Sequence, residues 1–353
     1  MFINRNTFLL FVIVCLVPVD AAAAIKNPFH TATPTSGIQS GKITIKVTID
    51  APSESHDVKA WIPYPVTDQF QKIEDVKIEG NFDNYAVLGQ NEPGNIALYA
   101  EWNKPKNQQR YVLYSFKVTA KERLMGRFSS VEPGVPQYIS KFIKSTKYIP
   151  IGGKIGELSK TITKGKKTIA QKHKAIFTWI VENTHRDPGV QGCGLGIVER
   201  TLASKSGKCA DLSSVYVALA RGAGIPAREV FGLRLGKKDG STDMTKGNHC
   251  WAEYYQPGYG WVQTDPADVT KLMFIRNIKP DQAGDISDYY VNNVDQYRIV
   301  LGRGGRGIFL NPRQSDGTLN YFMYPYAEIE GKSLEWLAAQ KKLKYSITFT
   351  KTQ

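Results

Sequence analysis

Three residues of the sequence could together form a thiol nucleophile and the groups that activate it. Cys209 opens a predicted helix, His249 begins a predicted strand, and Asp265 follows the next strand. A thiol becomes nucleophilic when it loses its proton, and both a helix N-terminus and a neighbouring imidazolium lower its pKa. A carboxylate that holds the imidazole fixes its tautomer. The set therefore predicts acyl transfer with Cys209 as nucleophile, His249 as base and acid, and Asp265 as the orienting group.

The elements that must position these residues follow from the spacing of apolar residues. Predicted helices cover 168–183 and 209–221, and predicted strands cover 227–235, the segment from 249 and 261–264. Pro257-Gly258 turns the chain between the last two strands, which makes them a hairpin. The hairpin brings the strand of His249 beside the strand that leads to Asp265, so we expect these two side chains to meet.

Each residue alone has an ordinary structural explanation. A free cysteine is often a buried small hydrophobe, a histidine at a strand start is often a satisfied polar group, and an aspartate before proline often starts a turn. The combination of Cys209 at a helix start with His249 and Asp265 on a hairpin favours the catalytic interpretation.

Four segments resemble the core of the transglutaminase-like superfamily. They are GKCAD from Gly207, ARGAGIPAR from Ala220, HCWAE from His249 and PGYGWVQTDP from Pro257. The resemblance covers Thr168 to about Asp268. It implies an α+β fold with a papain-like core, in which Cys209, His249 and Asp265 are the catalytic residues, and it is closest to the bacterial secreted branch, whose core commonly follows a β-sandwich.

The resemblance also limits the function. Active members form a thioester that is then attacked by water or by an amine. Similarity to the bacterial branch favours hydrolysis of peptide or amide bonds in a protein or peptide substrate. The alternatives are cross-linking of glutamine to an amine, and a non-catalytic cell-surface binding module on an inactive core. No cofactor or metal is expected, because the five histidines lack the close pairing of a zinc site.

Two more cysteines, Cys193 and Cys250, accompany Cys209 in the mature chain. Their pairing in a disulfide would spare the nucleophile, but burial of both as free thiols is an equally open alternative. Cys250 follows His249 directly. Alternation along a strand predicts that its thiol points to the opposite face, and Cys250 is therefore expected to be structural.

The domain organisation follows from changes of pattern along the chain. Residues 1–24 have the layout of a cleaved signal peptide, which predicts a periplasmic or secreted protein with no membrane span after cleavage. Short alternating strands over 25–123 predict a β-sandwich, and 124–166 reads as a connecting region. The core is expected over 167–277. The extension over 278–353 ends in a predicted strand, 345–350, that we expect to rejoin one of the sheets.

The charge balance points to the kind of partner. The 46 basic and 32 acidic residues give a net charge of +14, which suits an anionic cell-envelope component or no special partner. The lysines lack the aromatic interleaving of a nucleic-acid platform, so no nucleic acid is expected as a partner.

The glycine-rich run 302–307 precedes a strand-like segment and is therefore interpreted as a flexible basic loop, since a dinucleotide fingerprint needs a helix there. The oligomeric state does not follow from the sequence.

Overall fold

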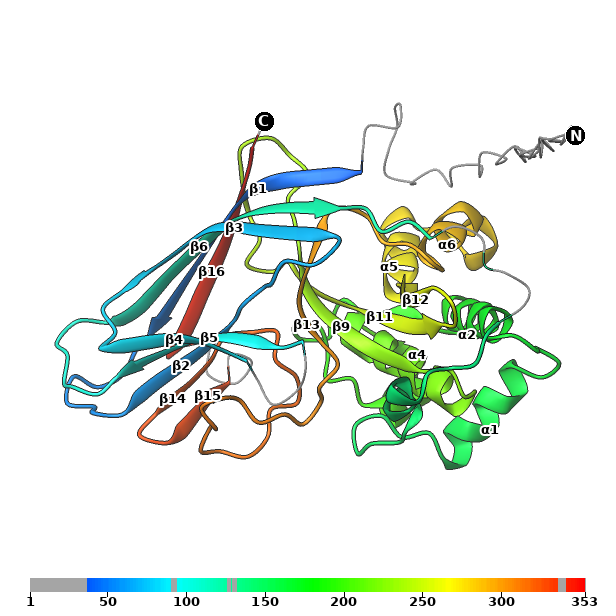
Figure 1. Cartoon of the computed structure of the whole chain (residues 1–353), viewed down its shortest axis with the longest axis horizontal. Coiled ribbons are helices and arrows are strands. Elements are labelled where there is room, and N and C mark those ends of the chain that lie inside the picture. The colour runs from blue at the N-terminus through cyan, green and yellow to red at the C-terminus, as the bar shows by residue number, and fades with distance from the viewer. Residues whose placement is uncertain (1–36, 90–93, 126–127, 129–131, 336–340, 353) are drawn as a thin grey trace, which may run out of the picture.

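The computed structural model describes residues 37–89, 94–125, 128, 132–335 and 341–352. The predicted signal peptide over 1–24 lies outside the described residues. The described chain has two parts that lie side by side, a β-sandwich and a mixed core of helices around a sheet (Figure 1). This confirms the predicted α+β class with a sheet-rich N-terminal part. No helix among the described residues is long and apolar enough to cross a bilayer.

The sandwich consists of two antiparallel five-stranded sheets. The strands of the first, in spatial order, are β10 (Ser241–Asp243), β16 (Leu343–Lys351), β1 (Ile38–Ile49), β6 (Arg110–Lys121) and β3 (Gln71–Gly80). Those of the second are β15 (Lys332–Glu335), β14 (Tyr326–Ile329), β2 (Val58–Pro63), β5 (Ile96–Trp102) and β4 (Asn84–Gly89). Alternation explains the first sheet: Ile43, Ile45, Val47 and Ile49 of β1 face the interior while the lysines and threonines between them do not.

The sandwich draws on both ends of the chain. β16 pairs antiparallel with β1, with Ile45 opposite Ile347, which confirms that the last predicted strand joins a sheet. β10 comes from the loop before His249 and pairs with β16. The sandwich sheet is thereby joined directly to the segment that carries His249 (Figure 1).

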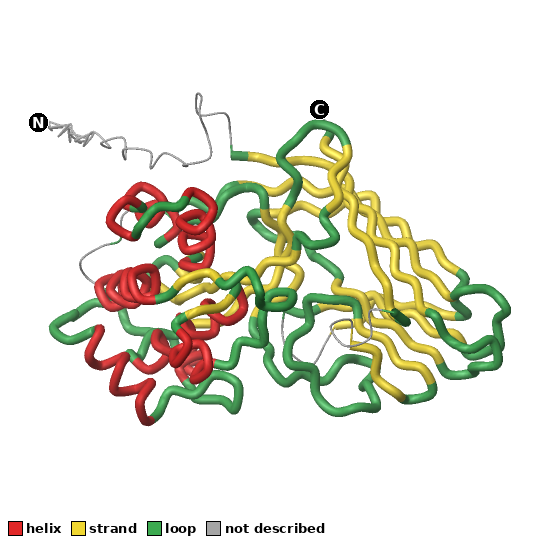
Figure 2. Tube along the Cα trace, turned by 180° about the vertical axis from the view of Figure 1, so that it is seen from behind, coloured by secondary structure: helices red, strands yellow, loops and turns green. Residues whose placement is uncertain are grey.

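The core sheet has four antiparallel strands in the order β12 (Gly260–Thr264), β11 (Asn248–Gln256), β9 (Ala227–Arg234) and β13 (Arg298–Arg303). Helix α4 (Cys209–Gly222) packs on this sheet, and α1 (Gly153–Ile162) and α2 (Ile169–Asn183) pack on α4. α3 (Val198–Ser204), α5 (Pro266–Arg276) and α6 (Gly284–Tyr290) complete the helical side, which Figure 2 shows from behind. Short β7 (His185–Arg186) and β8 (Ser206–Gly207) pair in parallel, and 3-10 turns lie at Gln137–Ile143 and Pro280–Gln282.

The helices and strands nearest the predicted site have the expected types and nearly the expected bounds. The predicted helix over 209–221 is α4, and the predicted hairpin is β11 with β12, in which Ala252 lies opposite Thr264. Helix α5 was not predicted, although Asp265 caps it and Pro266 occupies its first turn. The extension after residue 278 contributes β13 to the core sheet and β14 to β16 to the sandwich.

Candidate active site

Cys209 is the first residue of α4, and a loop packed against the helix start holds it there. The Asp211 carboxylate accepts hydrogen bonds from the amides of Lys208 (3.0 Å) and Gly196 (2.8 Å). Gly207 has to be glycine, because a Cβ there would lie 2.5 Å from the Asp211 Cβ. The Ala210 amide donates to the Cys193 carbonyl at 2.9 Å. The start of α4 and the loop of Cys193 are therefore one fixed unit, and it leaves Cys209 only 5% exposed.

His249 and Asp265 meet as the hairpin predicts. His249 Nε2 lies 2.7 Å from Asp265 Oδ2, and the two residues are 3% and 0% exposed. The other carboxylate oxygen of Asp265 accepts from the Asp268 amide at 2.9 Å and so caps α5. One carboxylate therefore anchors both the imidazole and a helix. Since Nε2 is occupied, Nδ1 is the ring nitrogen left for the Cys209 thiol.

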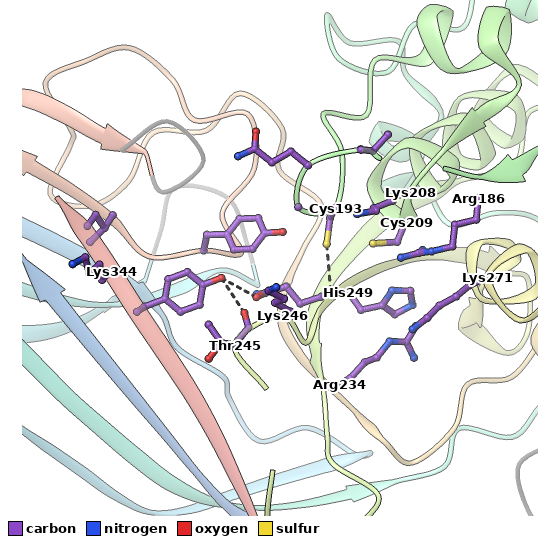
Figure 3. Close-up of a pocket in the computed structure, with 17 residues that line it drawn as sticks. Arg186, Cys193, Lys208, Cys209, Arg234, Thr245, Lys246, His249, Lys271 and Lys344 are labelled. Carbon is purple, nitrogen blue, oxygen red and sulfur yellow. Dashed lines mark hydrogen bonds between the residues drawn. The ribbon is translucent and has the colours of Figure 1, made fainter. Parts of the chain in front are cut away.

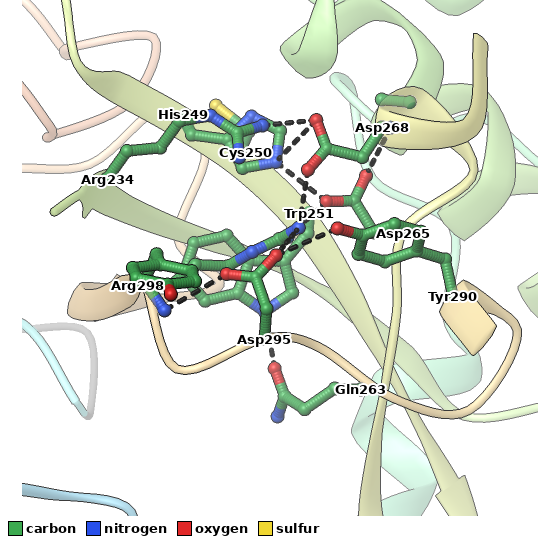
Figure 4. A network of polar contacts seen from close by, with 12 residues as sticks. Arg234, His249, Cys250, Trp251, Gln263, Asp265, Asp268, Tyr290, Asp295 and Arg298 are labelled. Carbon is green, nitrogen blue, oxygen red and sulfur yellow. Dashed lines mark hydrogen bonds and ion pairs between the residues drawn. The ribbon is translucent and has the colours of Figure 1, made fainter. Parts of the chain in front are cut away.

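A buried ion network lies behind this pair (Figure 4). Arg298, which is fully buried, forms ion pairs with Asp265, Asp268 and Asp295. Arg234 pairs with Asp268 from the other side. Burial opposes ionisation of Asp268, but attraction to Arg234 and then Arg298 outweighs it and holds the pKa of Asp268 well below its usual range. Three buried carboxylates thus share two guanidinium groups, and Asp265 also holds the imidazole of His249.

The three cysteines among the described residues are free thiols, and their sulfur atoms lie close together. The sulfur atoms of Cys193, Cys209 and Cys250 lie within 4.8 Å of one another. Cys250 was expected on the strand face opposite His249, but its sulfur still lies within 4.8 Å of the Cys209 sulfur. The Cys250 thiol also lies 3.7 Å from the Met323 sulfur.

The neighbouring thiols and the imidazole favour the thiolate form of Cys209. Hydrogen bonding from Cys193, then from Cys250, lowers the pKa of Cys209 well below its usual range despite burial, and His249 adds a hydrogen bond and its charge. Donation to Cys209 raises the pKa of Cys193, and burial raises the pKa of Cys250. Of the three sulfurs, Cys209 is thus the one that ionises first.

A cavity of about 720 Å³ opens onto Cys209 and His249 (Figure 3). Its walls come from both parts of the fold. The core contributes Cys193, Lys208 and Arg234, and β16 of the sandwich contributes Leu343 and Tyr345. The extension after residue 278 therefore lines the cavity, which answers a question that the sequence left open. The cavity is large enough to receive a segment of a peptide beside the thiol.

Sequence reasoning missed several residues of this site. Arg298 lies in the extension, 33 positions after Asp265, and only the pairing of β13 with β9 brings it inward. The glycine-rich run 302–307 is not a flexible loop: Arg303 pairs with Asp68 and Glu253, and Arg306 pairs with buried Glu229. These ion pairs join the run to the core and to the segment of Asp68.

Comparison with known proteins places the core in a family. The profile of the Transglutaminase-like superfamily matches residues 156–266. An uncharacterized protein of Haemophilus influenzae is 33% identical over 301 residues, which covers 78% of this chain and 81% of that protein. A protein-glutamine gamma-glutamyltransferase of Pseudomonas aeruginosa is 33% identical over 99 residues, or 27% of this chain and 15% of that enzyme.

A solved structure extends the likeness to the whole fold. The crystal structure of a candidate cysteine protease from Cytophaga hutchinsonii superposes with a TM-score of 0.56 at 16% identity, and covers 90% of this chain and 92% of that one. At this identity the similarity concerns the fold alone. The sequence matches, together with the core described above and this shared fold, show that the chain belongs to the transglutaminase-like superfamily.

The thiol cluster leads to a direct prediction. Cys193→Ala removes the neighbouring thiol that contributes most to lowering the pKa of Cys209, so this pKa should rise and the midpoint of Cys209 alkylation against pH should move upward. Because a hydrogen bond to a charged group contributes roughly 1.5–3 kcal/mol, alkylation by iodoacetamide below the midpoint should slow about tenfold or more. Cys193→Ser keeps a donor and serves as the matched control. Equal profiles for wild type and Cys193→Ala would contradict the role of the thiol.

Proposed function

We propose that the protein is a thiol acyl-transfer enzyme that hydrolyses peptide or amide bonds through a thioester on Cys209. The observation that carries the proposal is the buried hydrogen bond of His249 to Asp265 beside a cysteine at a helix start that faces a cavity. A histidine held in this way needs a partner that exchanges a proton with it, and the Cys209 thiol is the group in place.

In the first half of the reaction the Cys209 thiolate attacks the carbonyl carbon of the scissile bond. The carbonyl oxygen becomes an oxyanion, and the Cys209 amide at the start of α4 can donate to it, since among the described residues it has no other acceptor. The His249 imidazolium then gives its proton to the leaving amine as the C–N bond breaks. The acyl group remains on sulfur as a thioester.

In the second half a water molecule attacks the thioester carbon while His249 takes its proton. The C–S bond breaks, the acid product leaves, and thiolate and imidazolium are restored. Asp265 keeps the imidazole in one orientation through both halves and stabilises its charged form. Arg298 fixes Asp265 in turn, so its role is to position the carboxylate.

The charge of the cavity supports water as the acceptor. Arg186, Lys208 and Lys271 line it close to the thiol. A lysine side chain arriving as an ammonium ion is repelled by these cations, whereas water is not. The competing proposal is glutamine cross-linking, which the partial identity to the Pseudomonas aeruginosa gamma-glutamyltransferase favours.

We place the reaction outside the cytoplasm because of the signal-like layout of residues 1–24.

The experiment uses p-nitrophenyl acetate, a neutral activated ester that acylates reactive thiols. We expect a burst of nitrophenol, an acetyl group on Cys209 in the mass spectrum, and slow return of the free thiol. Cadaverine, a diamine similar to the lysine side chain, should not speed that return. Faster deacylation with acetyl-cadaverine as product would favour cross-linking instead.

Two controls complete the test. Cys209→Ala should give neither burst nor acetylated protein, and His249→Ala should weaken both. Wild type that stays unacetylated while its far-UV spectrum is native would refute the enzyme proposal. The protein would then be better described as a binding module on an inactive core.

A further inference from the structure

The charged residues that line the cavity beside Cys209 are all positive. Six residues that line it are cationic and none of its lining residues is acidic. The six come from separate segments: Arg186 of β7, Lys208 before α4, Arg234 of β9, Lys246 before β11, Lys271 of α5 and Lys344 of β16. Convergence of side chains from six segments on one cavity differs from a charge run along a solvated helix face, in which one element supplies them all.

Most of these cations are not neutralised by the protein. Arg234 is paired with Asp268. The other five form no ion pair with a carboxylate in the described part of the chain. Asp265 and Asp268 are taken up by His249, Arg234 and Arg298, and the Asp211 carboxylate at the start of α4 accepts from the Lys208 and Gly196 amides. No carboxylate lines the cavity to offset these five cations.

The positive groups nearest the thiol crowd one another. Figure 3 shows Lys208 beside Cys209, with Arg186 and Lys271 on the side of His249, and Lys344 at the far side. Repulsion from Arg234, followed by burial, lowers the pKa of Lys271 to about 8. Crowded, partly buried cations cost free energy, and a bound anion would relieve that cost.

We propose that this cavity selects acyl substrates that carry a carboxylate or another anionic group within about one or two residues of the scissile bond, held by Lys208, Arg186 and Lys271. The inference rests on the proposed function and names its substrate class. The anion is either an acidic side chain, a free C-terminal carboxylate or a phosphate, which share the chemistry that these cations recognise. Lys246 and Lys344 also line the cavity.

A pair of alkylating agents tests the proposal without any substrate. Iodoacetate and iodoacetamide react with thiolates in the same way but differ in charge. We expect the ratio of the iodoacetate rate to the iodoacetamide rate at Cys209 to exceed the ratio at a cysteine of the denatured chain about fivefold or more, because opposite charges a few ångströms apart attract by at least ~1 kcal/mol. High salt should reduce the ratio.

Substitutions of single cationic residues show which of them attract iodoacetate to Cys209. Arg186→Gln and Lys271→Gln should each lower the iodoacetate to iodoacetamide ratio several-fold, and the double variant should bring it near that of the denatured chain. Lys160→Gln removes an exposed lysine of α1, remote from the cavity lining, and should leave both rates unchanged. A ratio at Cys209 no higher than in the denatured chain would overturn the inference while leaving the nucleophile, and hence the proposed function, intact.

Protection experiments then distinguish the sources of the anion. N-acetylglutamate diamide analogues lack charge and serve as the reference, while acetyl-glutamate amide, acetylglycine and inorganic phosphate present a side-chain carboxylate, a terminal carboxylate and a phosphate. The probe that carries the preferred kind of anion should protect Cys209 from iodoacetamide at the lowest concentration. If Cys209 reacts with neither alkylating agent, the proposed function is refuted. Binding of the same three probes to the cavity can still be measured by calorimetry on Cys209→Ala. Absence of binding there would overturn the anionic selectivity.

Discussion

Cys209→Ala should abolish acyl transfer while the fold survives. The sulfur is the only atom in the account that becomes bonded to the substrate, so its loss should lower kcat/KM by about 10⁴-fold or more. Because Cys209 is small and lies at a helix start, alanine keeps the packing around it. The rate on an activated ester is the measurement, and thermal unfolding reports whether the fold is kept.

Cys250→Ala is a matched control for this first prediction. It removes a neighbouring buried thiol of the same cluster. That variant should lose activity only in part, through the pKa of Cys209, and should regain it as the pH is raised. If Cys209→Ala kept a substantial part of the wild-type rate, the nucleophile would have to be another residue.

Arg298→Met should cause the largest loss of stability. It leaves three buried carboxylates, Asp265, Asp268 and Asp295, without their shared cation. Removal of one partner from a buried ion pair costs about 3–5 kcal/mol, and here three carboxylates are affected. Urea unfolding measures the change. Arg276→Met, an exposed arginine at the end of α5, is the control and should change the unfolding free energy by less than about 0.5 kcal/mol.

If Arg298→Met does not fold, Arg298→Lys tests whether Arg298 positions the buried carboxylates. Lysine keeps the charge but lacks the planar fork that reaches several carboxylates at once. We expect a folded protein with a lower kcat and a shifted pH profile, because Asp265 is no longer held against His249. A stability and a pH profile equal to those of wild type would contradict a positioning role for Arg298.

Local sequence signals predicted the part of the site built from neighbouring elements. Cys209 at the start of α4, and the meeting of His249 with Asp265 across the β11 and β12 hairpin, depend on short-range periodicity and on one turn. The same kind of signal could have found α5, since Asp265-Pro266 is a typical helix start with an N-cap followed by proline.

The remaining parts of the site depend on long-range pairing. Arg298 enters the ion network through the register of β13 on β9, and Tyr345 reaches the cavity because β16 pairs with β1, which lies about three hundred residues earlier. Of these two strands, the periodicity predicted only β16, and it did not predict the strands beside it. For Cys250, alternation predicts the face of the strand, but it does not give the distance from that thiol to Cys209, which belongs to another element.

Differential alkylation of the three cysteines shows whether Cys209 is an activated nucleophile. The folded protein is treated briefly with iodoacetamide at pH 6, denatured, and treated with an isotope-labelled reagent, so that mass spectrometry gives the extent of reaction at each cysteine. The account predicts that Cys209 is modified in the folded state well ahead of Cys193 and Cys250, at a pH far below the ~8.5 at which an ordinary thiol ionises. Equal and slow modification of all three cysteines in the folded state would contradict it.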